Sequence, residues 1–225
     1  MNFEKIAAFV PMRHESIRVP GKNYRLIAGK PLYAWIIETL LSCPEISHVM
    51  VDTDSELILD GLAKHYPAVK TVLRPEALRA DTVPMNEILL YDTAQMEAEL
   101  YLQTHSTNPL LRPETISKAI RIFKDGWPGH DSLFGVTRWQ TRLYDSEGKA
   151  INHDPNILLR TQDLPPVYEE NSTLYLFTRQ NLIERHNRIG ARPLLFEVPP
   201  LEAVDIDEES DFLIAQALLE HVKKG

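Results

Sequence analysis

The feature that most constrains the fold is a repeated change of hydrophobic period along the chain. Short apolar runs with a period of about two residues, as strands require, alternate with amphipathic segments of period about 3.6, which is typical of helices. The alternation continues through most of the sequence. It predicts a βαβ chain, and therefore an α/β fold built on a mostly parallel sheet.

The segments of each kind are short and follow one another closely. The first helical segment, for example, begins with proline, which is favoured at the first position of a helix. We predict strands at residues 6–10, 46–51, 69–73, 99–103, 132–136, 173–178 and 194–198. We predict helices at residues 31–41, from 54 or 55 to about 66, and at 85–97, 113–123, 179–187 and 210–222.

The middle of the chain breaks this pattern. Residues 138–166 are polar and rich in Asp, Asn and Pro, and residues 144–148 (YDSEG) are typical of a hairpin tip. Because 225 residues suit one α/β domain, we expect a single domain over residues 1–225 with a small β-rich flap inserted at about 138–170.

Composition narrows the possible partners and the compartment. A net charge of −8 argues against a nucleic-acid partner, which would require a basic face. The single cysteine, Cys43, excludes an internal disulfide framework and suggests a reducing compartment. The apolar run near the N-terminus is too short for a secretion signal or a membrane span. We therefore expect a cytoplasmic protein without a membrane partner.

The charge is unevenly distributed. Residues 13–30 contain five basic residues and one acid, whereas residues 201–211 contain six acids and no base. If the two segments meet in the fold, they could hold a polyphosphate and its metal ion. The alternative is that both are solvated surface, as most charged runs are.

Polar clusters follow four of the predicted strands, at the rim where open parallel sheets bind ligands. Arg13, Ser16 and Lys22 suit phosphate, but the loop that carries them lacks the usual glycines, and no Walker A, GxGxxG, HExxH or GxSxG motif is present. The other clusters are the pair Asp52 and Asp54, the pair Gln103 and Thr104, and the pair Asp205 and Asp207.

Each aspartate pair has two interpretations. Asp54 could simply cap the helix that follows it, and Asp207 or Ser210 could cap the last helix. Alternatively, Asp205 and Asp207 point the same way if the chain is extended, with Ile206 facing the core, and their oxygens suit Mg²⁺.

Taken together, these segments resemble the acylneuraminate cytidylyltransferases (CMP-sialic acid synthetases), which are related to the CMP-Kdo synthetases. The family's opening segment, ARxGSKGxPxKN, corresponds to residues 11–23, and its closing DIDxxxD corresponds to residues 205–211. Between them, in family order, lie counterparts of GKPLxxxxI, VSTD, RPxELAxDT, LQPTSPLR and RxQDLP at residues 29–36, 51–54, 74–82, 102–112 and 160–165.

The resemblance implies a three-layer, Rossmann-like nucleotidyltransferase fold and a homodimer, with the flap as a candidate contact. It also implies Mg²⁺-dependent transfer of CMP from CTP to the anomeric hydroxyl of an acidic α-keto sugar, with release of pyrophosphate. By resemblance the catalytic residues are Arg13, Lys22 and Asp207, and the metal ligands are Asp205 and Asp207. The implied nucleotide contacts are Arg13, Ser16, Lys22, Asn23 and Arg74, and the implied sugar contacts are Gln103, Arg160 and Asn171.

The chain departs from the family pattern on the triphosphate loop and on the sugar side. His14 and Glu15 stand where the family has glycines, and THSTNPLLR replaces PTSPLR. Sialic acid is the default acceptor, and another nonulosonic acid, Kdo or a different acid remains open. Two further alternatives are a glycosyltransferase that uses Asp52 and Asp54 for its metal and a non-catalytic paralogue that binds nucleotide.

Overall fold

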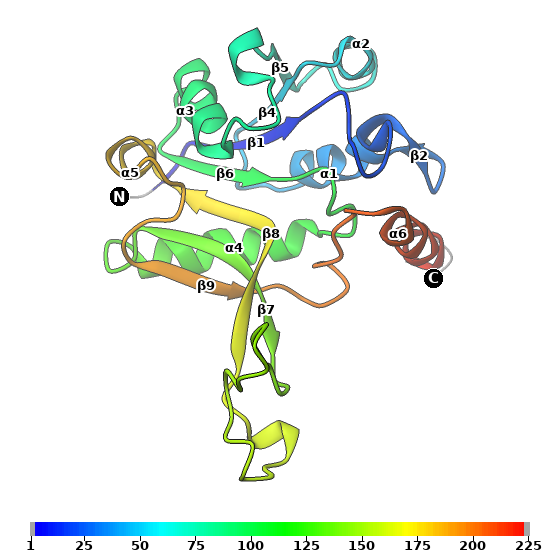
Figure 1. Cartoon of the computed structure of the whole chain (residues 1–225). Coiled ribbons are helices and arrows are strands. Elements are labelled where there is room, and N and C mark those ends of the chain that lie inside the picture. Colours follow the sequence, from blue (N-terminus) through cyan, green and yellow to red (C-terminus); the bar gives the residue numbers. More distant parts are fainter. Residues whose placement is uncertain (1–2, 223–225) are drawn as a thin grey trace.

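The computed structural model describes residues 3–222 and consists of a central sheet covered on both faces by helices (Figure 1). The strands of this sheet are β1 (Ile6–Met12), β4 (His48–Thr53), β5 (Lys70–Leu73), β6 (Leu100–Thr104), β7 (Ser132–Trp139), β8 (Val167–Phe177) and β9 (Pro193–Glu197). Their order is β5-β4-β1-β6-β8-β7-β9. Among the described residues all pairings in this sheet are parallel except those of β8, which runs antiparallel to β6 and β7. The predicted mostly parallel sheet is confirmed.

Two hydrophobic clusters, one on each face of the sheet, join it to the helices. Helices α1 (Leu32–Leu41), α2 (Glu56–His65) and α4 (Pro113–Gly126) contribute to one cluster, and α3 (Met85–Gln95) and α5 (Arg179–Arg185) to the other. Strand β1 serves both, because Ala8 and Val10 face one cluster while Ala7 and Phe9 face the other. The result is the three-layer architecture that the resemblance implied.

The last helix packs against the loop that follows β1, and this loop forms part of the site. Phe212, Ala215 and Leu219 of α6 (Glu209–Val222) form a third cluster with Val19, Ile27 and Leu32. The loop after β1 is therefore packed against the C-terminal helix. That loop also contains a short ribbon, β2 (Leu26–Ile27) and β3 (Lys30–Pro31), which the sequence did not predict.

The predicted helices are confirmed, with small shifts at their ends. Ser55, not Asp54, is the N-cap of α2, and its hydroxyl accepts a hydrogen bond from the backbone N–H of Ile58 at 3.3 Å. Pro31 lies just before α1 and Pro113 begins α4. Of the described helices, none is long and apolar enough to cross a bilayer.

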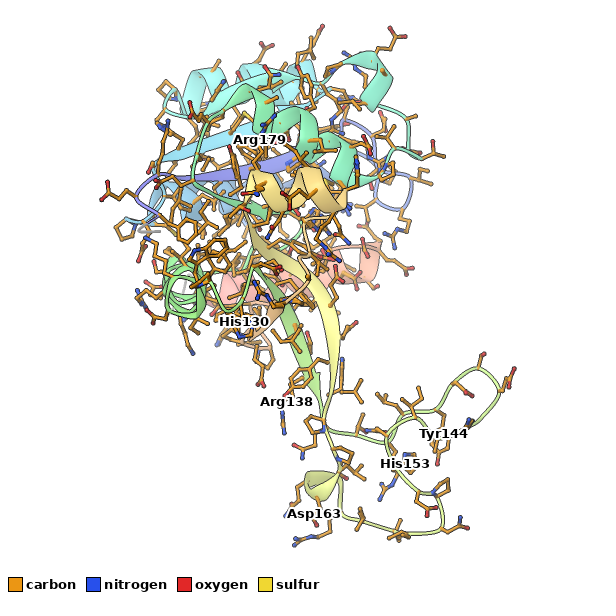
Figure 2. The ribbon with its side chains drawn as sticks, turned by 90° about the vertical axis from the view of Figure 1, so that its left-hand side faces the viewer. His130, Arg138, Tyr144, His153, Asp163 and Arg179 are labelled. Carbon is orange, nitrogen blue, oxygen red and sulfur yellow. The ribbon has the colours of Figure 1, made fainter. Side chains whose placement is uncertain are left out.

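The flap is an arm that stands clear of the body (Figures 1 and 2). Strands β7 and β8 run past the sheet as a two-stranded ribbon, in which Trp139 pairs with Val167. Residues 140–166 carry an isolated bridge between Tyr144 and Ala150, at the predicted hairpin tip, and a 3-10 turn at Thr161–Asp163. The sequence predicted that this strand starts at residue 173, but β8 begins at Val167. The first residues were missed because the polar residues of the arm lack a buried face.

A bulge marks the point where the arm leaves the body. The register of β7 and β8 shifts between Phe134 and Val136, so that β8 carries extra residues there. Ser172, at the bulge, adopts a φ of 56°. Gly135 lies opposite, where an added Cβ would be 2.8 Å from Oδ1 of Asn171. The bulge thereby turns Ser172 toward the end of the sheet where the ligand site is expected.

Candidate functional site

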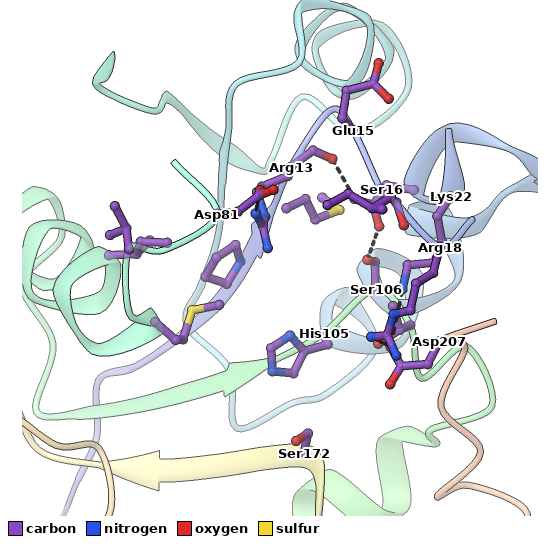
Figure 3. A pocket seen from close by; sticks show the side chains of 18 of the residues that line it. Arg13, Glu15, Ser16, Arg18, Lys22, Asp81, His105, Ser106, Ser172 and Asp207 are labelled. Atoms are coloured by element: carbon purple, nitrogen blue, oxygen red, sulfur yellow. Dashed lines mark hydrogen bonds and ion pairs between the residues drawn. The ribbon is translucent and has the colours of Figure 1, made fainter. Parts of the chain in front are cut away.

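A cleft of about 490 Å³ opens at the carboxyl ends of β1 and β6 (Figure 3). Its walls come from the loop after β1, the segment between β5 and α3, the residues after β6, Ser172 of β8, and Asp205 and Asp207. The basic opening segment and the acidic segment near the C-terminus therefore meet, as one of the two interpretations of the sequence predicted.

Side-chain hydrogen bonds hold the glycine-poor loop after β1 in shape. Asn23 is buried, donates to the carbonyl oxygen of Arg13 at 2.7 Å and accepts from the hydroxyl of Ser106 at 2.6 Å. Ser16 accepts from the backbone N–H of Val19 at 3.3 Å. Asn23 thus ties the loop to the end of β6 and also lines the cleft, and its contact with a nucleotide stays a prediction.

His14 fills the place of a family glycine without entering the cleft. Its ring nitrogen Nδ1 lies 2.7 Å from the hydroxyl of Ser55, and the ring stacks on Tyr24 at 5.1 Å. Its backbone N–H donates to Asp54 at 2.6 Å. The ring therefore packs behind the loop, whereas Glu15 lines the cleft.

Three cationic side chains of this loop face the cleft. Arg13 forms an ion pair with Asp81 of the opposite wall, and Arg18 donates to Oδ1 of Asp207 at 2.7 Å. The side chain of Lys22 is 11% exposed, and its Nζ donates to the carbonyl oxygen of Ile206 at 2.6 Å. Burial lowers the pKa of Lys22, while Asp207 and Asp205 act in the opposite direction. These cations are placed to neutralise a polyphosphate.

The acidic pair has the orientation predicted for a metal site. Ile206 is buried in the core, and Asp205 and Asp207 line the cleft on either side of it. Oδ1 of Asp205 is buried and has no hydrogen-bond partner among the described residues, and burial raises the pKa of this carboxyl. Asp211, not Asp207, caps the start of α6 by accepting from the backbone N–H groups of Asp207 and Glu208 at 3.0 and 2.8 Å.

The carboxylates of Asp205 and Asp207 are suitable ligands for Mg²⁺. An unsatisfied carboxylate oxygen beside a second carboxylate is a suitable hard-oxygen donor set, since Mg²⁺ is usually held by one or two carboxylates plus phosphates. Among the described residues no group of three or more His, Cys, Asp or Glu side chains could hold a metal ion alone. The remaining ligands would therefore have to come from substrate and water.

Arg74 lies at the cleft wall, but its guanidinium is engaged inside the protein. Its Nε lies 3.1 Å from both carboxylate oxygens of Asp52, and both residues are buried. Asp92 lies beneath them, and burial together with Asp52 raises the pKa of Asp92 to about 9. A protonated Asp92 can donate to Asp52, so the trio carries no net charge. Asp52 thus bonds Arg74, and Asp54 accepts from the backbone N–H of His14. Neither aspartate lines the cleft, so the structure does not support a glycosyltransferase metal site at this pair.

The residues predicted for the sugar are not among the described residues that line the cleft. Gln103 is fully buried behind it, and Asn171 bonds Thr173 within the bulge, with Oδ1 accepting from the hydroxyl at 2.8 Å. Arg160 is 74% exposed on the arm, where it pairs with Asp163 at 2.7 Å. Their roles in binding a sugar stay predictions.

The sequence did not single out His105, Arg188 or Asp92. His105 lines the cleft, and Gln103 links it to Arg188. The position of His105 at the end of a predicted strand could have drawn attention to it. Arg188 has no comparable signal, because it reaches Gln103 from a loop 85 residues away in the chain.

Comparison with known proteins gives a consistent result over almost the whole chain. The family described as "Cytidylyltransferase" matches residues 7–217. The CMP-N,N'-diacetyllegionaminic acid synthase of Legionella pneumophila is 33% identical, and the match covers 96% of this chain and 97% of that protein. N-acylneuraminate cytidylyltransferase A of Danio rerio is 27% identical over 94% of this chain, which spans 50% of that longer protein.

The fold is likewise found among solved structures. The structure of CMP:2-keto-3-deoxy-manno-octonic acid synthetase complexed with CTP is similar with a TM-score of 0.71. The match covers 97% of this chain and 99% of that one at 17% sequence identity. At that identity the likeness concerns the fold, and it agrees with the three layers and the mostly parallel sheet described above.

Proposed function

This chain belongs to the cytidylyltransferase family, and from that premise we propose that it transfers CMP from CTP to the anomeric hydroxyl of an acidic α-keto sugar, releasing pyrophosphate. One observation carries the proposal: Lys22 and Arg18 meet Asp205 and Asp207 across one cleft. A cationic wall beside an unsatisfied carboxylate suits a nucleoside triphosphate with its metal ion.

The basic residues of the cleft would bind phosphate groups, and its acidic residues would bind the metal ion. Arg13, Arg18 and Lys22 are placed to offset the charge of the triphosphate and of the departing pyrophosphate. Arg13 and Arg18 would exchange Asp81 and Asp207 for phosphate oxygens when CTP enters. Asp205 and Asp207 would hold Mg²⁺, which when bound supplies positive charge beside the phosphates.

The acceptor we propose is sialic acid or a related nonulosonic acid. Support comes from the names of the two relatives, which refer to N,N'-diacetyllegionaminic acid and N-acylneuraminate. The floor of the cleft offers polar groups for such a sugar, in His105, Ser106 and Ser172.

We further propose that the enzyme works as a homodimer in the cytoplasm. Arg160 pairs with Asp163 on an arm that projects away from the body (Figure 2). If Arg160 binds the carboxylate of the sugar, that sugar must therefore lie in the cleft of a second copy of the chain. The arm exposes Ile151, Ile157 and Leu158, the last to 88%, which is the composition of a contact surface. The one cysteine, Cys43, is a buried thiol, as suits a reducing compartment.

The proposal is tested by a screen for pyrophosphate release. The purified chain would be supplied with each of the four nucleoside triphosphates, with and without Mg²⁺, and with a panel of sugars that includes sialic, legionaminic and pseudaminic acids and Kdo. We expect release only with CTP, an acidic sugar and Mg²⁺ together. Background release with every acidic sugar would show that the chain is not this enzyme.

A further inference from the structure

The amide of Gln103 is held in one orientation by partners of fixed character. Its Oε1 accepts from the guanidinium of Arg188 at 2.7 Å, and its Nε2 donates to the carbonyl oxygen of Thr104 at 3.1 Å. A guanidinium only donates and a carbonyl oxygen only accepts, so exchanging the amide oxygen and nitrogen would break both bonds. The orientation of Gln103 therefore follows from its surroundings.

This orientation determines the tautomer of His105. Nε2 of Gln103 lies 2.9 Å from Nε2 of His105, and it has a second hydrogen to donate. Burial lowers the pKa of His105 to about 3, and the neighbouring charges of Arg188 and Lys22 act in the same direction. The ring is thus neutral, Nε2 accepts, and the single ring proton is on Nδ1.

Arg188, which fixes Gln103, is itself fixed from several sides. Its guanidinium carbon lies 3.5 Å from the centre of the Tyr175 ring, and its Nη2 is 3.9 Å from Glu170. Its backbone N–H donates to Asn86 of α3 at 3.2 Å. The chain of contacts from Arg188 through Gln103 to His105 is therefore built into the body of the protein.

His105 is the end of this chain that meets the cleft (Figure 3). No described residue accepts a hydrogen bond from its Nδ1. The cations and carboxylates suited to a triphosphate come from the loop after β1 and from residues 205–207, whereas His105 projects from the end of β6, with Ser172 of β8 on the cleft wall. It therefore borders the part of the cleft left to the second substrate.

We propose that His105 determines acceptor specificity: its Nδ1–H donates a hydrogen bond to an oxygen atom of the acidic sugar. This inference rests on the proposed function. Because Nδ1 carries the proton and Nε2 is occupied by Gln103, His105 is not the base that takes the proton of the attacking hydroxyl. His105 is a fixed donor near the positive charges of Arg188 and Lys22. It therefore favours an oxygen at that point of the sugar over an N–H or ammonium group.

The first test is independent of catalysis. Nitrogen-15 NMR of the histidine rings in the full chain distinguishes a protonated ring nitrogen from an unprotonated one, and loss of a signal in His105→Asn assigns it. We expect the Nδ1–H form in the wild type. In Gln103→Glu the carboxylate can only accept, so we expect the Nε2–H form. An Nε2–H ring in the wild type would overturn the proposal.

The second test is kinetic. His105→Ala should raise KM for the acidic sugar about ten-fold, the effect of one lost hydrogen bond in a polar site, while KM for CTP stays within about two-fold. His105→Asn should recover most of the loss, because its amide N–H lies near the position of Nδ1. The exposed His65, replaced by Asn, is the control.

The kinetic outcomes separate the two proposals. An unchanged sugar KM in His105→Ala, or a larger change for CTP than for the sugar, would contradict the role of His105. If the wild type releases no pyrophosphate with any acidic sugar, the proposed function fails and the sugar assignment fails with it. The NMR result would in that case still decide the tautomer.

Discussion

At the scale of single residues, the buried trio beneath the cleft is the most unusual feature. Asp52 and Arg74 form an ion pair out of contact with solvent, and Asp92 adds a second carboxyl whose oxygens accept no hydrogen bond from the described residues. Burial raises the pKa values of both carboxyls, and Arg74 opposes this. A protonated Asp92 can be accommodated there, because it is uncharged and can donate to Asp52.

This trio predicts a pH dependence of stability. The folded-state pKa of Asp92 is about 9, above its ordinary value near 4, so between these values only the unfolded chain loses the proton. The free energy of unfolding should therefore fall as pH rises, by about 1.4 kcal/mol per pH unit from this group. In Asp92→Asn, which keeps a donor toward Asp52, that component should vanish. Urea unfolding at several pH values measures it.

The exposed Asp60 of α2 provides the matched control. Asp60→Asn should leave the slope of unfolding free energy against pH as it is in the wild type. If Asp92→Asn and the wild type have the same slope, Asp92 is ionised in the folded protein and the interpretation of the trio is wrong.

The acidic pair predicts a loss of turnover with an intact fold. Asp207→Ala should lower kcat at least about a hundred-fold, because it removes a proposed metal ligand and the partner of Arg18. The adjacent, exposed Glu208, whose side chain does not line the cleft, serves as the control when replaced by Ala. Undiminished Mg²⁺-dependent turnover in Asp207→Ala would show that the metal assignment is wrong.

Sequence reasoning identified the charged residues of the site better than the polar ones. The sequence could identify four of them because they lie in a basic and an acidic segment, each directly after a predicted strand: Arg13, Lys22, Asp205 and Asp207. The position of His105 held a hint, but its protonation depends on Gln103 and Arg188, which come together only in three dimensions. The same holds for Asp92, whose burial against Asp52 no local pattern reveals.

At the scale of elements, the bulge in β7 and β8 decides where the arm leaves the sheet. Its tightest point is Gly135, where an added Cβ would lie 2.8 Å from Oδ1 of Asn171 and 3.1 Å from Cγ2 of Val198. Asn171 is held in place by bonds to Thr137 and Thr173, so it cannot move away easily. The bulge therefore depends on a residue without a side chain at this position.

Gly135→Ala should accordingly reduce the free energy of unfolding by about 1–3 kcal/mol through overpacking. Urea denaturation gives the value. The double variant Gly135→Ala/Asn171→Ala tests the cause, because removing the amide relieves the closest contact and should make the two effects less than additive. Strict additivity, or no loss in Gly135→Ala, would argue against the clash.

The elements themselves were largely predictable from hydrophobic period, whereas their arrangement was only partly so. The helices were located because their apolar faces repeat at the helical period. The antiparallel direction of β8 was not predicted, since alternation along a strand does not state which neighbour it pairs with. The outer half of β8 was missed because in the arm neither face of the ribbon is covered by a helix.

At the scale of the whole molecule, the proposed role of Arg160 in binding the sugar implies a site shared between two chains. Arg160 does not line the cleft of its own chain, and it pairs with Asp163 on the arm, which projects away from the body (Figure 2). We therefore expect Arg160→Ala and Lys22→Ala to be nearly inactive alone and to complement each other when unfolded and refolded together. A mixed dimer contains one site with both residues intact, so random pairing should restore about a quarter of wild-type activity.

The complementation is measured as pyrophosphate release by the refolded mixture, with each variant refolded alone as the control. Restored activity places Arg160 in the site of the partner. A mixture no more active than its components would show that Arg160 acts within its own chain or outside the reaction.

The central claim, transfer of CMP from CTP to an acidic sugar, is tested most directly by following the α-phosphorus of CTP. CTP labelled at that atom would be incubated with the chain, Mg²⁺ and the best acidic sugar from the screen, and the products separated and identified by mass. The account predicts that the label appears in a CMP-sugar, in amounts equal to the pyrophosphate released. Label recovered only as CTP, or as free CMP without a sugar adduct at any time point, would contradict it.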